Sequence, residues 1–88
     1  MNSEEKEEFE RIKKDFSDIT EDKKLSKAEA DDFMSDITKL IGIYALDKDS
    51  EIEKLIKKML DFGDKNNLAV QGSILEFEAV KKGKISRK

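Results

Sequence analysis

Residues 25–46 read LSKAEADDFMSDITKLIGIYAL, the longest segment of the chain in which apolar side chains recur with a helical period. Ser26 and Glu29 stand three residues apart at its start, the spacing of a capping box. We therefore expect a helix over residues 27–46. Its apolar arc is wider than one neighbouring helix can cover, so this helix should contact at least two others. The arc consists of Ala30, Phe33, Met34, Ile37, Leu40, Ile41 and Tyr44.

A narrower apolar stripe precedes this segment, over residues 4–19. Asn2 or Ser3 can supply the N-cap of a helix there, and the glutamates that follow carry the charge that the N-terminal end of a helix favours. A narrow stripe is typical of a helix that packs on the outside of a bundle or pairs with a second chain. The stripe consists of Phe9, Ile12, Phe16 and Ile19.

A third helix is predicted over residues 51–62, because Ser50 and Glu53 repeat the capping-box spacing. Gly63 is placed to adopt the left-handed conformation that commonly ends a helix. The apolar face is broad and lysines occupy the opposite side, so this helix should belong to the core. The face consists of Ile52, Leu55, Ile56, Met59, Leu60 and Phe62.

Residues 68–80 allow two interpretations. In a helix, Val70, Ile74 and Phe77 share one side, although Gly72 inside it costs about 1 kcal/mol relative to Ala. In a hairpin, residues 71–73 form the turn and residues 75–79 alternate between apolar and acidic side chains. The preceding helices, together with Gly83 and the lysines near the end, favour a helix over residues 67–82.

Length and composition indicate one small domain. The chain has 88 residues, of which 44% are charged and 36% hydrophobic, and it contains no proline that would interrupt a helix. We predict an all-α fold, a small antiparallel helical bundle of three to four helices within residues 1–82. A basic C-terminal tail follows over residues 83–88, and the basic residues at this end are Lys81, Lys82, Lys84, Arg87 and Lys88.

The composition argues against several functions. A chain without histidine or cysteine lacks the usual general base, the usual zinc ligands and the thiol nucleophile. Residues 47–58 begin like a calcium-binding loop, but Ile52 stands where the turn needs glycine and Lys58 where a bidentate glutamate is needed. We therefore expect no enzymatic activity, no cofactor and no metal. Without an apolar run near the N-terminus or one of membrane-spanning length, a cytoplasmic location is expected.

Charge is distributed unevenly along the chain. Residues 1–53 contain 17 acidic and 9 basic residues, whereas residues 54–88 contain 4 and 9. On the outer face of the predicted second helix, Glu29, Asp32 and Asp36 form a ridge spaced three and four apart, where like charges repel by a few tenths of a kcal/mol per pair. Local stability does not require this ridge. We therefore predict that the protein binds a basic surface of a protein partner through the ridge and modulates or inhibits that partner.

The sequence also allows three competing interpretations. The ridge can attract the chain's own lysines, at Lys54, Lys57 and Lys58 or in the tail. A self-assembling structural component would form a homodimer through the 4–19 stripe. A nucleic-acid accessory factor would use the basic tail, but the acidic net charge of −3 and the single Tyr44 make nucleic acid an unfavourable partner.

In size, helix count and acidic, histidine-free surface, the chain is similar to small helical inhibitors, antitoxins and bacteriocin immunity proteins. This similarity is one of architecture. Architecture alone does not fix function.

Overall fold

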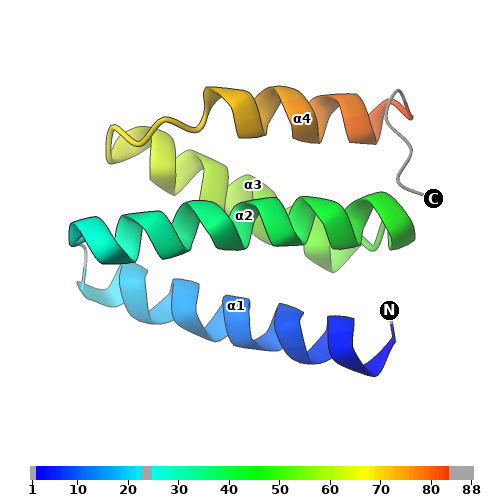
Figure 1. The fold of residues 1–88 in the computed structure, drawn as a ribbon, viewed down its shortest axis with the longest axis horizontal. Helices are drawn as coiled ribbons and strands as arrows, with labels where there is room; N and C mark the ends of the chain where they lie inside the picture. Colours follow the sequence, from blue (N-terminus) through cyan, green and yellow to red (C-terminus); the bar gives the residue numbers. More distant parts are fainter. Residues whose placement is uncertain (1, 23–24, 84–88) are drawn as a thin grey trace.

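The computed structural model describes residues 2–22 and 25–83, and in this part of the chain it contains four helices and no strand. The helices are α1 (Ser3–Asp22), α2 (Lys27–Asp47), α3 (Ser50–Lys65) and α4 (Gln71–Lys81), and successive helices run in opposite directions (Figure 1). The predicted all-α bundle is confirmed. Residues 71–81 are helical, so the hairpin interpretation is wrong.

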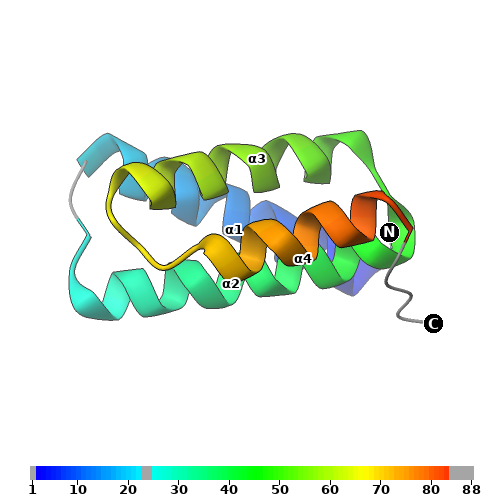
Figure 2. The same cartoon turned by 90° about the horizontal axis from the view of Figure 1, so that it is seen from above.

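The central element is α2, which packs against each of the other three helices. In Figure 1, α1 and α4 lie on opposite sides of α2, and Figure 2 shows α3 alongside α2, with α1 beneath them. Helix α3 packs against both α1 and α2. The broad apolar arc of α2 explains this position, because a helix with three neighbours needs apolar side chains over most of its circumference. The expectation that it contacts at least two helices is confirmed.

The core runs along the inner faces of all four helices. Ile37 of α2 and Ile56 of α3 are fully buried. Phe16 lies against Phe33 and Phe62, with ring centroids 5.9 and 5.6 Å away, so one aromatic cluster joins the ends of α1, α2 and α3. The apolar stripe of α1 belongs to this core: Phe9 and Ile12 are buried, and Phe16 and Ile19 are partly buried against it.

The helix starts follow local hydrogen-bonding rules, with one departure from expectation. Ser26 and Glu29 form the predicted capping box. The second predicted box is wrong: Asp49, not Ser50, is the N-cap of α3, and its carboxylate accepts a hydrogen bond from the Glu51 backbone N–H at 2.7 Å. The Glu53 side chain is directed elsewhere and accepts a hydrogen bond from the Tyr44 hydroxyl.

The end of α3 also differs from the prediction. Gly63 is a helical residue, and α3 continues to Lys65. The left-handed residue is Asn67, with φ 61°, and it completes a Schellman motif: the Leu68 N–H bonds the Gly63 carbonyl at 2.9 Å, and the Asn67 N–H bonds the Asp64 carbonyl at 3.1 Å. This longer helix end explains why α4 begins at Gln71 and not at residue 67.

Gly63 is required for a different reason, which is close packing. A Cβ atom at this position would lie 2.8 Å from Val70 Cγ1 and 3.1 Å from Phe33 Cε2. The missing side chain therefore lets the residues that lead into α4 return directly onto α3.

Within the described residues, no helix is both long and apolar enough to cross a membrane.

Candidate functional site

The three acidic residues predicted from the second helix lie in different environments. Glu29 and Asp32 are exposed, and Glu29 also serves the α2 cap. Asp36 is only 8% exposed and lies where α1 packs against α2, so the prediction that it stands on an outer face is wrong. The helical wheel places Asp36 at the edge of the apolar arc, and in the folded chain α1 covers that edge.

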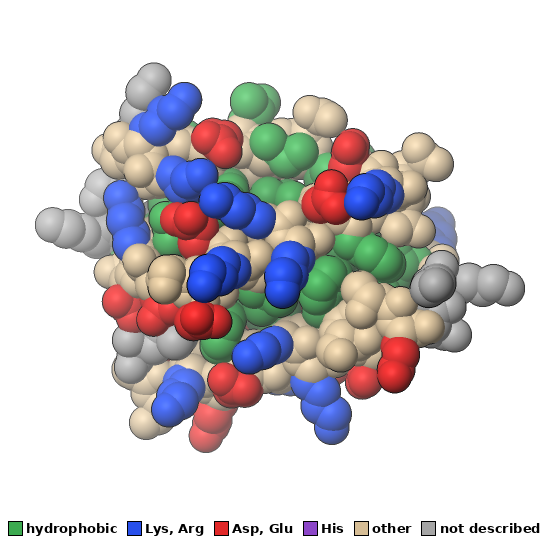
Figure 3. Space-filling view, turned by 180° about the vertical axis from the view of Figure 1, so that it is seen from behind, with side chains coloured by type: hydrophobic (Ala, Val, Ile, Leu, Met, Phe, Trp, Pro, Cys, Tyr) green, Lys and Arg blue, Asp and Glu red, His purple; other side chains and the backbone are tan. Residues whose placement is uncertain are grey.

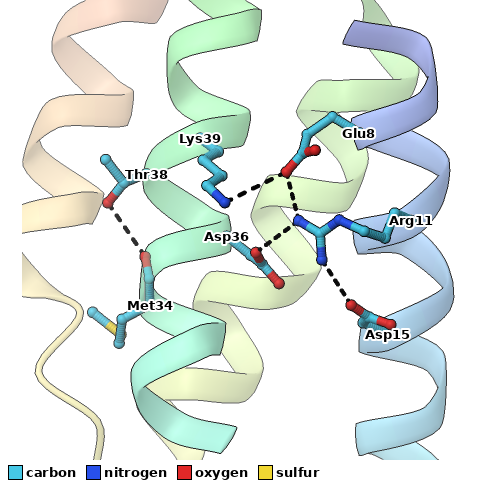
Figure 4. A network of polar contacts seen from close by, with 7 residues as sticks. All are labelled: Glu8, Arg11, Asp15, Met34, Asp36, Thr38 and Lys39. Atoms are coloured by element: carbon cyan, nitrogen blue, oxygen red, sulfur yellow. Dashed lines mark hydrogen bonds and ion pairs between the residues drawn. The ribbon is translucent and has the colours of Figure 1, made fainter. Parts of the chain in front are cut away.

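Asp36 is held by a polar network across the α1–α2 interface (Figure 4). Arg11 Nη2 donates to Asp36 Oδ1 at 3.2 Å and to Glu8 Oε1, while Arg11 Nη1 donates to Asp15 Oδ2 at 2.9 Å. Lys39 Nζ lies 3.6 Å from Glu8 Oε1, so a second cation closes the network from α2. One guanidinium thus joins carboxylates from both helices.

Protonation equilibria reflect this arrangement. Burial raises the pKa of Asp36, and the hydrogen bond from Arg11 opposes that rise. The same guanidinium lowers the pKa of Glu8 through a hydrogen bond. The pKa of Arg11 is raised in turn, mainly by its hydrogen bond to Glu8. Burial opposes this rise, and the contact with Asp36 adds to it. The network therefore offsets part of the unfavourable effect of burial on the Asp36 carboxylate.

Next to this network, α1 and α2 enclose a cavity of about 220 Å³ that we call the acidic groove. Its floor is apolar and consists of Ile19 and Phe33. Carboxylates from both helices surround this floor. They are Asp15 and Asp18 of α1 and Glu29, Asp32 and Asp36 of α2.

The acidic groove is one end of a longer furrow along the α1–α2 seam. A middle cavity of about 300 Å³ contains the Arg11 network, and it shares Asp15, Asp32 and Asp36 with the acidic groove. At the other end, an open cavity of about 610 Å³ shares Glu8 and Lys39 with the middle one. Eight carboxylates and two cations line the whole furrow. The acids are Glu4, Glu5, Glu8, Asp15, Asp18, Glu29, Asp32 and Asp36, and the cations are Arg11 and Lys39.

The lysines of α3 do not serve as the counter-charges of this furrow. Lys54 Nζ lies 3.9 Å from Glu51, and Lys57 Nζ lies 3.2 Å from Glu53, both within α3. Lys58, also on α3, is exposed. Seen from behind in Figure 3, lysine side chains gather over the centre of the face opposite the furrow. The described residues that pair with the furrow acids are Arg11 and Lys39.

The described part of the basic C-terminal end belongs to α4. Lys81 lies in its last turn, with Nζ 5.3 Å from the centre of the Phe77 ring and 3.9 Å from Glu78 Oε1. Lys82 is the exposed C-cap. Lys84, Arg87 and Lys88 lie outside the described residues.

Sequence reasoning missed the α1 side of the site. Asp15 and Asp18 precede Phe16 and Ile19 of the apolar stripe, and residues next to such a stripe lie at the border of a helix interface. That pattern marks them as border residues, but only the packing of α1 on α2 places them opposite Asp32. Within residues 2–22 and 25–83, no group of three or more acidic, histidine or cysteine residues has an arrangement that could hold a metal ion.

No protein-family model, curated protein or solved structure matches this chain. The candidate site therefore rests on the geometry and chemistry of the chain itself.

Proposed function

We propose that this chain is a non-catalytic protein that binds a basic segment of another protein in the acidic groove and thereby modulates or blocks that partner. The observation that carries the proposal is the convergence of five carboxylates from two helices around the apolar floor of Ile19 and Phe33. Such a site suits an arginine or lysine side chain, whose apolar stem contacts the floor while its charged end meets the carboxylates.

The Arg11 network supports this chemistry, because it shows a guanidinium bound between the same two helices. The neighbouring acids have capacity for another cation. Within residues 2–22 and 25–83, no ion pair reaches Asp18 or Asp32, which face the acidic groove from α1 and α2. Concentrated acidic charge also accelerates encounter with a basic partner.

Fold stability gives no reason for this concentration of charge. Carboxylates on adjoining helix surfaces repel one another, and the cost is greater where the surface is partly desolvated. A binding site explains why such a cost is kept, since residues used in recognition are often unfavourable for the isolated fold.

The proposal is tested by affinity capture from the native cell with three forms of the chain. The wild type is compared with Asp18→Asn/Asp32→Asn, which removes two charges from the acidic groove. The matched control is Glu51→Gln/Asp61→Asn, which removes two charges from exposed positions of α3. We expect a protein that is retained by the wild type and the control, lost with the groove variant and released by added salt. Equal retention by all three forms would contradict the proposal.

The other two functions have less support. A homodimer through the stripe of α1 would require Phe9 and Ile12, which are buried in the core of the same chain. A nucleic-acid interface at the basic end would lack Lys81 as a free cation, because Lys81 contacts Phe77 and Glu78. The acidic furrow would repel phosphates.

A further inference from the structure

We infer that the furrow accepts an amphipathic helix, whose basic residues meet the acidic groove and whose apolar residues enter the open cavity at the other end, where Gly42 determines access. This inference rests on the proposed function and deepens it by specifying the chemistry of the bound segment. It is carried by the lining of the open cavity and by Gly42.

The open cavity has an apolar floor and an acidic rim. Gly42, Ile43 and Leu46 of α2 form the floor, and Glu4, Glu5 and Glu8 of α1 stand on the rim, with Lys39 beside them. Leu46 is 59% exposed, which is unusual for a leucine in a chain where most large apolar residues are buried. An apolar side chain that enters here would cover Leu46, and basic neighbours of that side chain would meet the rim.

Neither the backbone conformation nor close packing requires a glycine at position 42. It lies within α2 without a positive φ, and a Cβ atom added there would meet nothing within 4 Å. Gly63 shows the contrast, because there a Cβ would collide with Val70 and Phe33. Glycine inside a helix is less favourable than alanine. The missing side chain at Gly42 therefore makes α2 less stable than alanine would, and it leaves the cavity open.

The dimensions of the furrow suit a helical ligand. It extends along α1 from Glu4 to Ile19 and along α2 from Glu29 to Leu46. At 1.5 Å per residue these stretches are about 22 to 26 Å long, the length of a helix of about 15 residues. The Arg11 network lies between the two ends and separates the apolar cavity from the acidic groove. A matching segment has its apolar and basic residues about two to three turns apart.

The inference is tested with two synthetic helical peptides of about 15 residues. The amphipathic probe has leucine and phenylalanine near one end and arginines near the other. The charge-only probe has serines in place of the leucine and phenylalanine. Binding is measured by calorimetry and mapped by backbone amide chemical shifts, for the wild type and for Gly42→Leu, which places a bulky side chain on the floor of the cavity. The matched control is Gly72→Leu, because a Cβ at Gly72 also meets nothing within 4 Å and Gly72 lies on α4.

We expect the wild type and Gly72→Leu to bind the amphipathic probe about tenfold or more tightly than the charge-only probe. The burial of one large apolar side chain contributes more free energy than a tenfold change in affinity requires. Gly42→Leu should bind both probes equally weakly. Gly42→Ala, which adds one methyl group, provides a second variant in case the leucine disturbs α2.

Two results would overturn the inference in different ways. If Gly42→Leu and Gly42→Ala keep the preference for the amphipathic probe, the apolar cavity is not part of the site. The proposed function would then still stand, provided that Asp18→Asn/Asp32→Asn weakens both probes. If neither probe binds the wild type at low salt, both the proposed function and the inference fail.

Discussion

The Tyr44 hydroxyl of α2 donates a hydrogen bond of 2.7 Å to Glu53 Oε1 of α3, and it thereby ties the end of one helix to the start of the next. Tyr44 is only 4% exposed, and its ring lies 5.4 Å from that of Phe77. Burial first, and then the Glu53 carboxylate, raise the pKa of Tyr44 from 10.0 to about 12. The same hydrogen bond, together with Lys57, lowers the pKa of Glu53.

This contact predicts the alkaline behaviour of the protein. Because the folded pKa lies above the unfolded value, the contribution of protonated Tyr44 to stability is complete below pH 10 and is lost as the pH rises through about 12. Tyr44 is the only tyrosine and there is no tryptophan, so ultraviolet absorbance reports its ionisation directly. Glu53→Gln should lower the measured pKa. Ionisation near pH 10 in the folded wild type would contradict the prediction.

Ile37 should be among the residues on which stability depends most. It is fully buried in α2, so Ile37→Ala should lower the free energy of unfolding by about 2–5 kcal/mol. Urea denaturation followed by circular dichroism measures this loss. Leu46→Ala, at a 59% exposed position of the same helix, is the control and should change stability by about 0.5 kcal/mol or less. A loss below about 1 kcal/mol for Ile37→Ala would be inconsistent with the core described above.

Substitution by alanine should destabilise the fold at one glycine and stabilise it at two others. Gly63→Ala brings a methyl group within 2.8 Å of Val70 Cγ1 and should destabilise the fold by about 1–3 kcal/mol. Gly42→Ala and Gly72→Ala place theirs in open space within helices and should stabilise it by about 0.5–1 kcal/mol. Thermal unfolding of the three variants checks the order. Destabilisation by Gly42→Ala would show that α2 needs glycine there after all.

Arg11 should be coupled more strongly to Asp36 than to Asp15. The first pair joins α1 to α2 with Asp36 largely buried, whereas the second is an exposed pair within α1. Double-mutant cycles with alanine should give a coupling energy of about 0.5–1.5 kcal/mol for Arg11 with Asp36 and about 0.2–0.5 kcal/mol for Arg11 with Asp15. Equal coupling energies would mean that the interhelical pair stabilises the fold no more than the exposed pair within α1 does.

The acidic groove should affect binding much more than folding. Asp18→Asn/Asp32→Asn should leave the free energy of unfolding within about 0.5 kcal/mol of the wild type, because both residues are exposed. The association rate with a basic partner or peptide should fall, and its dependence on ionic strength should weaken. Stopped-flow measurements at two salt concentrations separate these effects. A loss of stability with unchanged binding would mean that these two charges stabilise the fold and do not contribute to binding.

Much of the fold could be predicted from the sequence because it depends on local rules. The apolar period of residues 25–46 and the box formed by Ser26 and Glu29 located α2 and placed Ile37 in the core. The apolar face predicted for residues 51–62 placed Ile56 there in the same way. The choice of Asp49 over Ser50 as the cap of α3 could not be made in this way. Both residues can cap a helix, and the Tyr44 contact removes Glu53 from the box that would favour Ser50.

The candidate site was only half predictable because it depends on how two helices meet. Residue spacing placed Glu29 and Asp32 together on one helix. It could not show that α1 covers Asp36 or that Asp18 faces the same groove, because the relative position of two helices is not encoded in either helix alone. Gly63 is similar: its role depends on Val70, which packs against it through tertiary structure.

The way in which α4 is attached has a consequence for local unfolding. It is the shortest helix, its N-cap Val70 makes no side-chain capping hydrogen bond, and Gly72 lies in its first turn. Its main packing partner is α2, whereas α1, α2 and α3 all contact one another. Amide hydrogens of α4 should therefore exchange through an opening that leaves the other three helices folded, and those of α2 only through complete unfolding.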